Sequence, residues 1–360
     1  MRLLFVIYGS LQQISGGYLY DRKVIEYLEG QGVEVDCLQL PACPYLLCPL
    51  QSLYPPLRRL FRVHHPGGYD CIVIDELTHP SVFLPVCRRV RPGPPVVVLL
   101  HHLKIQERVG PVIRIIARCM ERRLLRSCQA VIVTSNTTRQ TVHDLIGSKT
   151  EVYVCPPGSD TLIQNLPGEG PGGGKAAAVG GRPARLLVTG NIIPRKGHDL
   201  LIRMLADLVD LRWELRIVGA VADRRYKRRV DRLVRRCGLE DRIIYTGALS
   251  GQALLRQYEE ADIFVFPSRY EGFGISLAEA IRAGVPFVAF ASGAVPEVSG
   301  GEGLLVPPGN LGIFRHHLRR LIADLEFREQ AAALSCSLAA QLPTWKRTGA
   351  AFFRAIQAIV

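Results

Sequence analysis

The order of apolar and helical segments along the chain is the feature that most restricts its fold. Short apolar runs typical of buried strands, such as 2–9, 94–102 and 261–266, alternate with longer stretches of helical character. This alternation predicts an α/β protein in which helices cover parallel sheets on both faces. Because 360 residues exceed what a single core usually serves, we expect two such domains.

The glycine- and proline-rich segment 166–183 interrupts this alternation once and predicts a linker. We therefore expect a first α/β domain over 1–165 and a second over 184–342. The remaining residues, 343–360, read as an amphipathic helix with Trp345, Phe352 and Phe353 on its apolar side.

The composition is that of a globular protein, with 48% hydrophobic and 21% charged residues. Ten scattered cysteines without a C-x-x-C pair are typical of reduced thiols. Met1 leads directly into a strand candidate, and no run of 18 apolar residues occurs. We expect a cytoplasmic protein that does not span a membrane.

The formal net charge of +13 predicts acidic partners. Residues 101–126 contain seven Lys and Arg but only two Glu, and residues 224–236 contain eight Lys and Arg but only one Asp. The second stretch favours a solvated helix face. For the first stretch, and for 57–63 with Arg58, Arg59 and Arg62, two interpretations stay open: a solvated face, or docking on the anionic inner face of a membrane. No nucleic acid partner is expected.

The segment 266–279 predicts a site for a diphosphate. A strand end is followed by a loop containing Gly272 and Gly274 and by a helix start, where unpaired N–H groups attract anions. We expect the diphosphate at the amides around Gly274, Ile275 and Ser276. Glu279 lies one turn further into the helix, within reach of a ribose diol, and Glu271 in the loop faces the sugar.

The spacing of the two glutamates alone also fits an ordinary surface helix. The GFG between them, in a strand–loop–helix context, favours a ligand site instead. The sequence EGFGISLAEAIRAGVPFVA resembles the donor-site motif of retaining glycosyltransferases of the GT-B type, in particular glycosyltransferase family 4. The resemblance implies two Rossmann-like domains that face each other across a cleft. It also implies a UDP-, GDP- or ADP-sugar donor, no other cofactor, a donor contact at Phe273, and a last helix that returns to the first domain.

The segment 189–201 joins a strand end to a helix and contains Arg195 and Lys196, whose charges suit a leaving diphosphate. Lys196 matches the lysine that the family has here. The chain departs at Asn191, which stands where the family arginine is expected, and Arg195 is the candidate to replace its charge.

Further expected site residues follow strand ends. Gly16 and Gly17 are similar to the glycine loop of the first domain, and His101, with His102 as the fallback, takes the place of the family histidine that contacts the transferred sugar. Gly219 and Gly247 end strands that face the base and ribose. The alternatives are a simple glycine loop, a core histidine and tight strand-to-helix turns.

These patterns together predict a retaining hexosyltransferase with His101, Lys196 and Glu271 at the reaction centre, Glu271 not acting as a nucleophile. The acceptor is a glycan, a glycolipid or a small molecule. No D-x-D segment is present, so we expect no metal. A nucleotide-sugar epimerase of the same fold and a non-catalytic sugar-nucleotide binder remain the alternatives.

Overall fold

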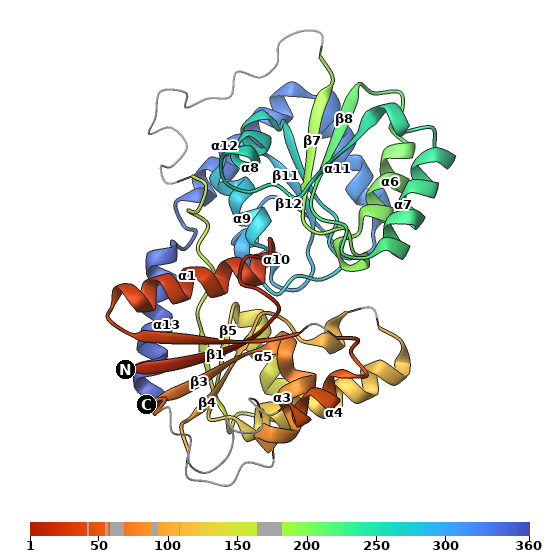
Figure 1. The fold of residues 1–360 in the computed structure, drawn as a ribbon. Helices are drawn as coiled ribbons and strands as arrows, with labels where there is room; N and C mark the ends of the chain where they lie inside the picture. Colours follow the sequence, from red (N-terminus) through yellow and green to blue (C-terminus); the bar gives the residue numbers. More distant parts are fainter. Residues whose placement is uncertain (42, 55–56, 58–67, 88–92, 108, 164–181) are drawn as a thin grey trace. The chain divides into compact units, whose positions relative to one another are not determined.

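A computed structural model describes residues 1–360 except 42, 55–56, 58–67, 88–92, 108 and 164–181. The chain divides into two compact units (Figure 1). The first comprises Met1–Gln13, Gly17–Pro157 and Trp345–Val360, and the second comprises Ile14–Gly16 and Gly158–Thr344. Nearly all of the expected linker, and the expected membrane-docking residues Arg58, Arg59 and Arg62, lie outside the described residues.

The first unit is built on a six-stranded parallel sheet of order β2-β1-β3-β4-β5-β6. Its strands are β1 (Arg2–Tyr8), β2 (Glu34–Leu40), β3 (Cys71–Asp75), β4 (Val96–Leu100), β5 (Ala130–Val133) and β6 (Glu151–Val154). Every residue of β3 and β4 is buried, as expected for central strands covered on both faces.

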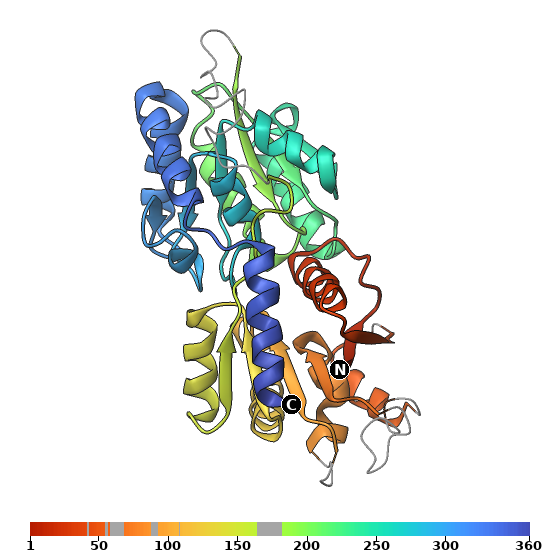
Figure 2. The ribbon, with the colours of Figure 1, turned by 90° about the vertical axis from the view of Figure 1, so that its left-hand side faces the viewer.

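Helices cover both faces of this sheet. The α-helices are α1 (Gly16–Gly30), α3 (His79–Cys87), α4 (Pro111–Ser127), α5 (Asn136–Ile146) and α13 (Trp345–Ile359), and the 3₁₀ turns are η1 (Cys48–Leu53), η2 (Glu76–Thr78) and η3 (Lys104–Gln106). Side chains of α3, α4 and α5 form one core cluster with Leu4 and Val6. Phe5 points to the other face and stacks on Phe352 of α13, which crosses the sheet there (Figure 2).

The second unit repeats the plan with a parallel sheet of order β12-β11-β10-β7-β8-β9. Its strands are β7 (Ala184–Thr189), β8 (Trp213–Val218), β9 (Ile243–Gly247), β10 (Ile263–Phe266), β11 (Phe287–Phe290) and β12 (Leu304–Val306). The observed sheets confirm the prediction of two parallel α/β layers.

Two core clusters hold the helices of the second unit to opposite faces of its sheet. One contains side chains of α6 and α11, and the other contains side chains of α9 and α12. The elements are α6 (His198–Ala206), α7 (Arg224–Arg236), α8 (Gly251–Glu260), α9 (Ile275–Arg282), α10 (Val295–Val298), α11 (Leu311–Ala323), α12 (Leu325–Ala339), η4 (Pro194–Lys196) and η5 (Glu240–Arg242).

Glycines in left-handed conformations set the ends of α9. Gly274 caps its start with φ 107°, and Gly284 follows its end with φ 67°. Side chains with a Cβ rarely adopt such angles, so the chain begins and ends the helix where these glycines stand. The helix start that the sequence predicts after Gly274 is confirmed.

Among the helices that the structure describes, none combines the length and apolar character that crossing a bilayer requires.

Candidate active site

The second unit brings Arg195 and Lys196 onto one carboxylate. Glu271 Oε1 lies 2.8 Å from Lys196 Nζ, and Glu271 Oε2 lies 2.9 Å from Arg195 Nη1. The two bases sit on η4, directly after β7, and Glu271 lies in the β10–α9 loop. The sequence analysis identified these three residues in separate motifs. It did not predict their contact, because Glu271 lies 75 and 76 positions away from the two bases.

The ion pairs decide the charge of this cluster. Burial acts to raise the pKa of Glu271, but the charges of Arg195 and Lys196 outweigh burial and hold the pKa at about 2. Burial lowers the pKa of Lys196, and the facing Glu271 opposes that shift. One carboxylate thus balances two cations, which leaves one positive charge. Both oxygens of Glu271 are engaged by the bases, where the sequence suggested that this carboxylate faces the sugar.

Gly197, next to Lys196, permits a backbone contact that fixes η4. Its φ of 71° is left-handed, and a Cβ there would lie 2.0 Å from the carbonyl oxygen of Pro267. Any larger residue would push η4 away from the end of β10. This glycine therefore holds the two bases against Glu271.

Glu279 is held by a tyrosine that the sequence analysis missed. The hydroxyl of Tyr258 on α8 donates to Glu279 Oε2 at 2.8 Å and lies 3.1 Å from Thr189 Oγ1. Burial raises the pKa of Glu279 to about 7, while the Tyr258 hydrogen bond and the Lys196 charge act against the shift. The contact between Tyr258 and Glu279 was not predicted, because an aromatic residue on a helix before β10 is more typical of a core position than of a site.

The start of α9, where the sequence predicts an anion site, has backbone amides without partners in the helix. The amides of Leu277 and Ala278 already bond to the carbonyl of Gly274, and no side chain caps the helix. The N–H groups of Ile275 and Ser276 are consequently the helix donors left for a ligand. In the loop before them, Gly272, Phe273 and Gly274 are buried.

The ends of β7 and β8 approach each other through glycine. A Cβ on Gly219 would lie 2.1 Å from the carbonyl oxygen of Gly190, and the amide of Gly219 donates to the carbonyl of Gly247 at 2.8 Å. The close approach by itself requires Gly219. Gly247 has a left-handed φ of 76° with open space around its Cβ position, so a turn conformation explains it. Asn191 follows Gly190 and is partly buried.

In the first unit, the structure brings Gly17 and His101 together. A Cβ on Gly17 would touch the ring of His101 at 3.4 Å. The amides of His101 and His102 both donate to Glu76 Oε2, at 2.9 and 2.8 Å, which fixes the backbone after β4. Gly16 begins α1.

The two histidines point to different partners. Nε2 of His102 lies 3.0 Å from Glu107 Oε1, whereas Nε2 of His101 faces Asp21 Oδ1 at 3.4 Å and Asp75 Oδ2 at 4.0 Å. Sequence reasoning missed both aspartates. Asp75 ends β3, and the strand-end rule that identified His101 could have found it.

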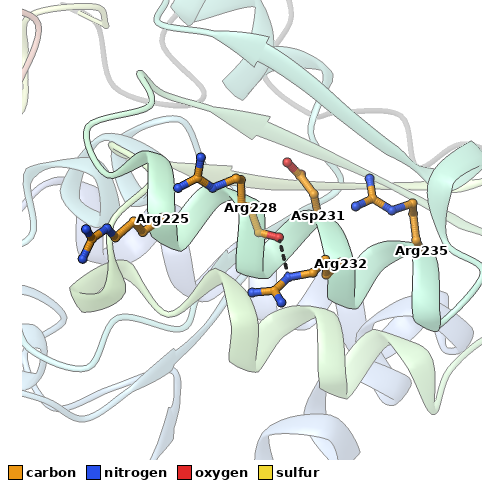
Figure 3. Close-up of a pocket in the computed structure, with 5 residues that line it drawn as sticks. All are labelled: Arg225, Arg228, Asp231, Arg232 and Arg235. Atoms are coloured by element: carbon orange, nitrogen blue, oxygen red, sulfur yellow. Dashed lines mark hydrogen bonds between the residues drawn. The ribbon is translucent and has the colours of Figure 1, made fainter.

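A further basic surface lies on α7, away from these residues in sequence. A hollow of about 660 Å³ is lined by Arg225, Arg228, Asp231, Arg232 and Arg235. Figure 3 shows these side chains along α7. All four arginines are exposed, in keeping with the expected solvated helix face.

Two family models match the chain. A "Glycosyl transferase 4-like domain" covers residues 15–158, and "Glycosyl transferases group 1" covers residues 183–324. The two matched segments account for most of the first and second units, respectively.

Curated relatives agree with these matches. A GDP-mannose-dependent alpha-(1-6)-phosphatidylinositol monomannoside mannosyltransferase of Mycobacterium tuberculosis is 28% identical over 236 residues, which is 62% of this chain and 59% of the relative. A D-inositol 3-phosphate glycosyltransferase of Geodermatophilus obscurus is 28% identical over 308 residues, 79% of this chain and 65% of the relative. The chain thus spans less than two thirds of these relatives.

Solved structures share the fold along the whole chain. Sucrose-phosphate synthase from Thermosynechococcus elongatus superposes with a TM-score of 0.78 at 21% identity, covering 99% of this chain and 98% of that one. Anabaena HepE in complex with UDP-glucose gives 0.74 at 17% identity, covering 99% and 100%. The fold is GT-B, and the chain belongs to the GT4-type glycosyltransferases, with a 4-like domain in its first half and a group 1 domain in its second.

Proposed function

We propose that this chain is a metal-independent, retaining hexosyltransferase that moves a sugar from a nucleotide diphosphate-sugar to an acceptor hydroxyl. The observation that carries the proposal is the grouping of Lys196 and Arg195 on Glu271, in the same unit as the open start of α9. A pre-formed cationic cluster stabilises the charge that builds up on a leaving diphosphate. Because the cluster keeps one positive charge after pairing, it can act without a divalent ion.

In the proposed reaction, the bond between the anomeric carbon and the phosphate oxygen breaks, and its electron pair goes to the diphosphate. Lys196, Arg195 and the amides of Ile275 and Ser276 take up the developing charge. The acceptor oxygen bonds to the anomeric carbon on the same face, and its proton passes to the leaving phosphate oxygen. Glu271 holds the two bases in position and forms no covalent bond.

The other predicted residues bind the donor. Glu279 accepts hydrogen bonds from the ribose diol, and Gly219 and Gly247 leave room for the nucleotide. Gly16 and Gly17, at the start of α1, contact the donor phosphates, and His101 contacts the transferred sugar. UDP-, GDP- and ADP-sugars are all candidate donors: one relative is GDP-mannose-dependent and HepE binds UDP-glucose. The acceptor is a glycan, a glycolipid or a small molecule.

A donor panel tests the proposal. The protein is incubated with UDP-, GDP- and ADP-sugars in excess EDTA, and free sugar is followed by NMR. We expect slow hydrolysis of one donor, with the α or β configuration retained in the first product. Lys196→Ala should lose this turnover, and Arg232→Ala on the exposed face of α7 is the matched control. Epimerisation at C2 would indicate the epimerase, and donor binding without any turnover would indicate the non-catalytic binder.

A second proposal, peripheral attachment to the inner face of an anionic membrane from the cytoplasm, rests on α4. This helix exposes Val112 and Ile115, 66% and 65% accessible, beside the exposed Arg114, Arg118 and Arg122. Apolar side chains that insert between headgroups, together with nearby arginines, are typical of helices that lie in a bilayer interface. A lipid acceptor would then be reached at the membrane surface.

A further inference from the structure

The ring of His101 presents one nitrogen to two buried carboxyl groups. Nε2 lies 3.4 Å from Asp21 Oδ1 and 4.0 Å from Asp75 Oδ2, and these side chains are 0% and 2% exposed. Asp21 comes from α1 and Asp75 from the end of β3, so two elements converge on the residue that follows β4. The other nitrogen, Nδ1, is not among the buried unpartnered atoms and makes no hydrogen bond within the described residues.

Two of these three groups lack ordinary partners, whereas Asp75 Oδ1 accepts the amide of Leu77 at 2.7 Å. In the described part of the chain, both oxygens of Asp21 and Nε2 of His101 lack a hydrogen bond. A buried charge without a partner is costly, so the three groups must satisfy one another. The guanidinium of Arg22 acts on Asp21 only at a distance, because it donates to the carbonyls of Leu11 and Gln13.

The protonation of the pair follows from its burial. Burial raises the pKa of Asp21 to about 7, and it raises the pKa of Asp75 to about 8 with the Asp21 charge adding to the shift. Near neutral pH the pair therefore holds on to a proton, and its remaining negative charge faces Nε2. Burial also lowers the pKa of His101, so its ring is neutral there. The other titratable groups around the pair are Tyr18, Tyr20, Cys37 and Glu76.

Contacts of the His101 backbone and ring restrict the orientation of this side chain. Glu76 accepts the amide of His101, and Thr134 Oγ1 donates to its carbonyl at 3.3 Å. The ring packs edge-on against Tyr20, with centroids 5.3 Å apart, and Gly17 closes the side next to Nε2. At 3.4 Å, the separation of Nε2 from Asp21 Oδ1 is slightly longer than an ordinary N–H···O hydrogen bond.

We propose that Asp21 and Asp75 are positioning residues that fix His101 as its Nε2–H tautomer, so that Nδ1 accepts a hydrogen bond from a hydroxyl of the bound sugar. A neutral imidazole carries one proton, and a carboxylate facing one nitrogen selects the form that donates to it. The part concerning the sugar rests on the proposed function. It implies that the site recognises a sugar hydroxyl as a donor, and not a group that can only accept.

The tautomer is measurable without any transfer reaction. The protein, which has nine histidines, is labelled with ¹⁵N-histidine, and the His101 signals are assigned as those lost in His101→Gln. We expect a neutral ring protonated at Nε2 at pH 7. In Asp21→Asn, the amide can donate to Nε2 and should shift the population toward Nδ1–H. If Asp21→Asn fails to fold, Asp75→Asn provides a second test. If both variants fail to fold, the spectrum of the parent still shows which nitrogen of His101 carries the proton.

Three outcomes would overturn the proposal: a parent ring protonated at Nδ1, a cationic ring at pH 7, or an Asp21→Asn ring with the tautomer of the parent. A divalent ion bound stoichiometrically to the parent and lost in Asp21→Asn would also overturn it, since these three residues offer ligand atoms within 4.8 Å of one another. The role toward sugar is tested separately. Asp21→Asn should reduce kcat with little change in donor KM, whereas a protein with the expected tautomer and no transfer would refute the proposed function alone.

Discussion

The hydroxyl of Tyr258 donates a 2.8 Å hydrogen bond to Glu279 Oε2, and both side chains are buried. The same hydroxyl lies 3.1 Å from Thr189 Oγ1 at the end of β7. The glutamate is thereby oriented without a ligand, which would reduce the entropy lost on binding the ribose that we propose for it. A buried tyrosine of α8 thus positions a residue of the proposed site.

Replacing Glu279 by alanine should weaken donor binding about 5- to 150-fold, because one or two hydrogen bonds worth about 1–3 kcal/mol disappear. Tyr258→Phe should weaken binding less, since the carboxylate remains but loses its orientation. Titration calorimetry with the donor found in the panel measures both. Binding by Glu279→Ala equal to that of the parent would remove the residue from the site.

Stability should depend on pH through the same glutamate. Its folded pKa of about 7 lies above the ordinary value of 4.5, so the folded protein holds a proton that the unfolded chain has released. The contribution of Glu279 to stability is therefore complete at low pH and declines as pH rises from about 4.5 to 7. Urea unfolding at several pH values should show a smaller decline in Glu279→Gln. An identical slope in both proteins contradicts the raised pKa.

The two bases on η4 should contribute unequally to turnover. Lys196→Ala should reduce kcat by about 10²-fold, as expected for loss of a charge that stabilises a transition state. Arg195→Ala should cost much less, because its Nη1 also donates to the carbonyl of Tyr270 and so is partly structural. Steady-state kinetics of the two variants, with Arg232→Ala as control, decide. Equal losses would mean that Arg195 has taken over the role of the arginine replaced by Asn191.

Transfer should survive excess EDTA. The cluster of Lys196, Arg195 and Glu271 retains a positive charge, and the sequence has no D-x-D segment. Initial rates with and without chelator, then with added Mn²⁺ or Mg²⁺, measure this. Activity that vanishes with chelator and returns with metal would mean that the diphosphate is neutralised by an ion.

Vesicles should bind through α4. The protein should co-sediment with anionic vesicles at low salt, and binding should weaken steeply as salt rises. Replacing Arg114, Arg118 and Arg122 by glutamine should release it, with about 1 kcal/mol lost per charge. Replacing Arg228, Arg232 and Arg235 on α7 (Figure 3) is the matched control and should have little effect. If no protein sediments at low salt, a soluble acceptor is favoured.

Sequence patterns predicted what depends on neighbours along the chain. The alternation of apolar runs predicted both sheets, and the loop with Gly272 and Gly274 predicted the start of α9, because φ angles and burial are local requirements. The contact of Lys196 with Glu271 could not be predicted in this way. It depends on β10 lying beside β7, a strand order that no local pattern encodes.

The aspartates beside His101 illustrate the same limit. Asp21 sits on a helix where its spacing is unremarkable, and only the packing of α1 on the sheet places it against a histidine 80 positions away. The carboxyl group of Asp21 is buried and has no hydrogen bond among the described residues, which the sequence alone does not reveal.

The stacking of Phe5 on Phe352 has a consequence for how the protein is made. The first unit lacks part of its core until α13 has left the ribosome, although the rest of that unit is synthesised first. Phe352 is fully buried, so the first unit lacks this contact to Phe5 on β1 while the second unit is translated. The described residues of the second unit end at Thr344, before α13, so all of its segments are synthesised before the first unit receives its last helix.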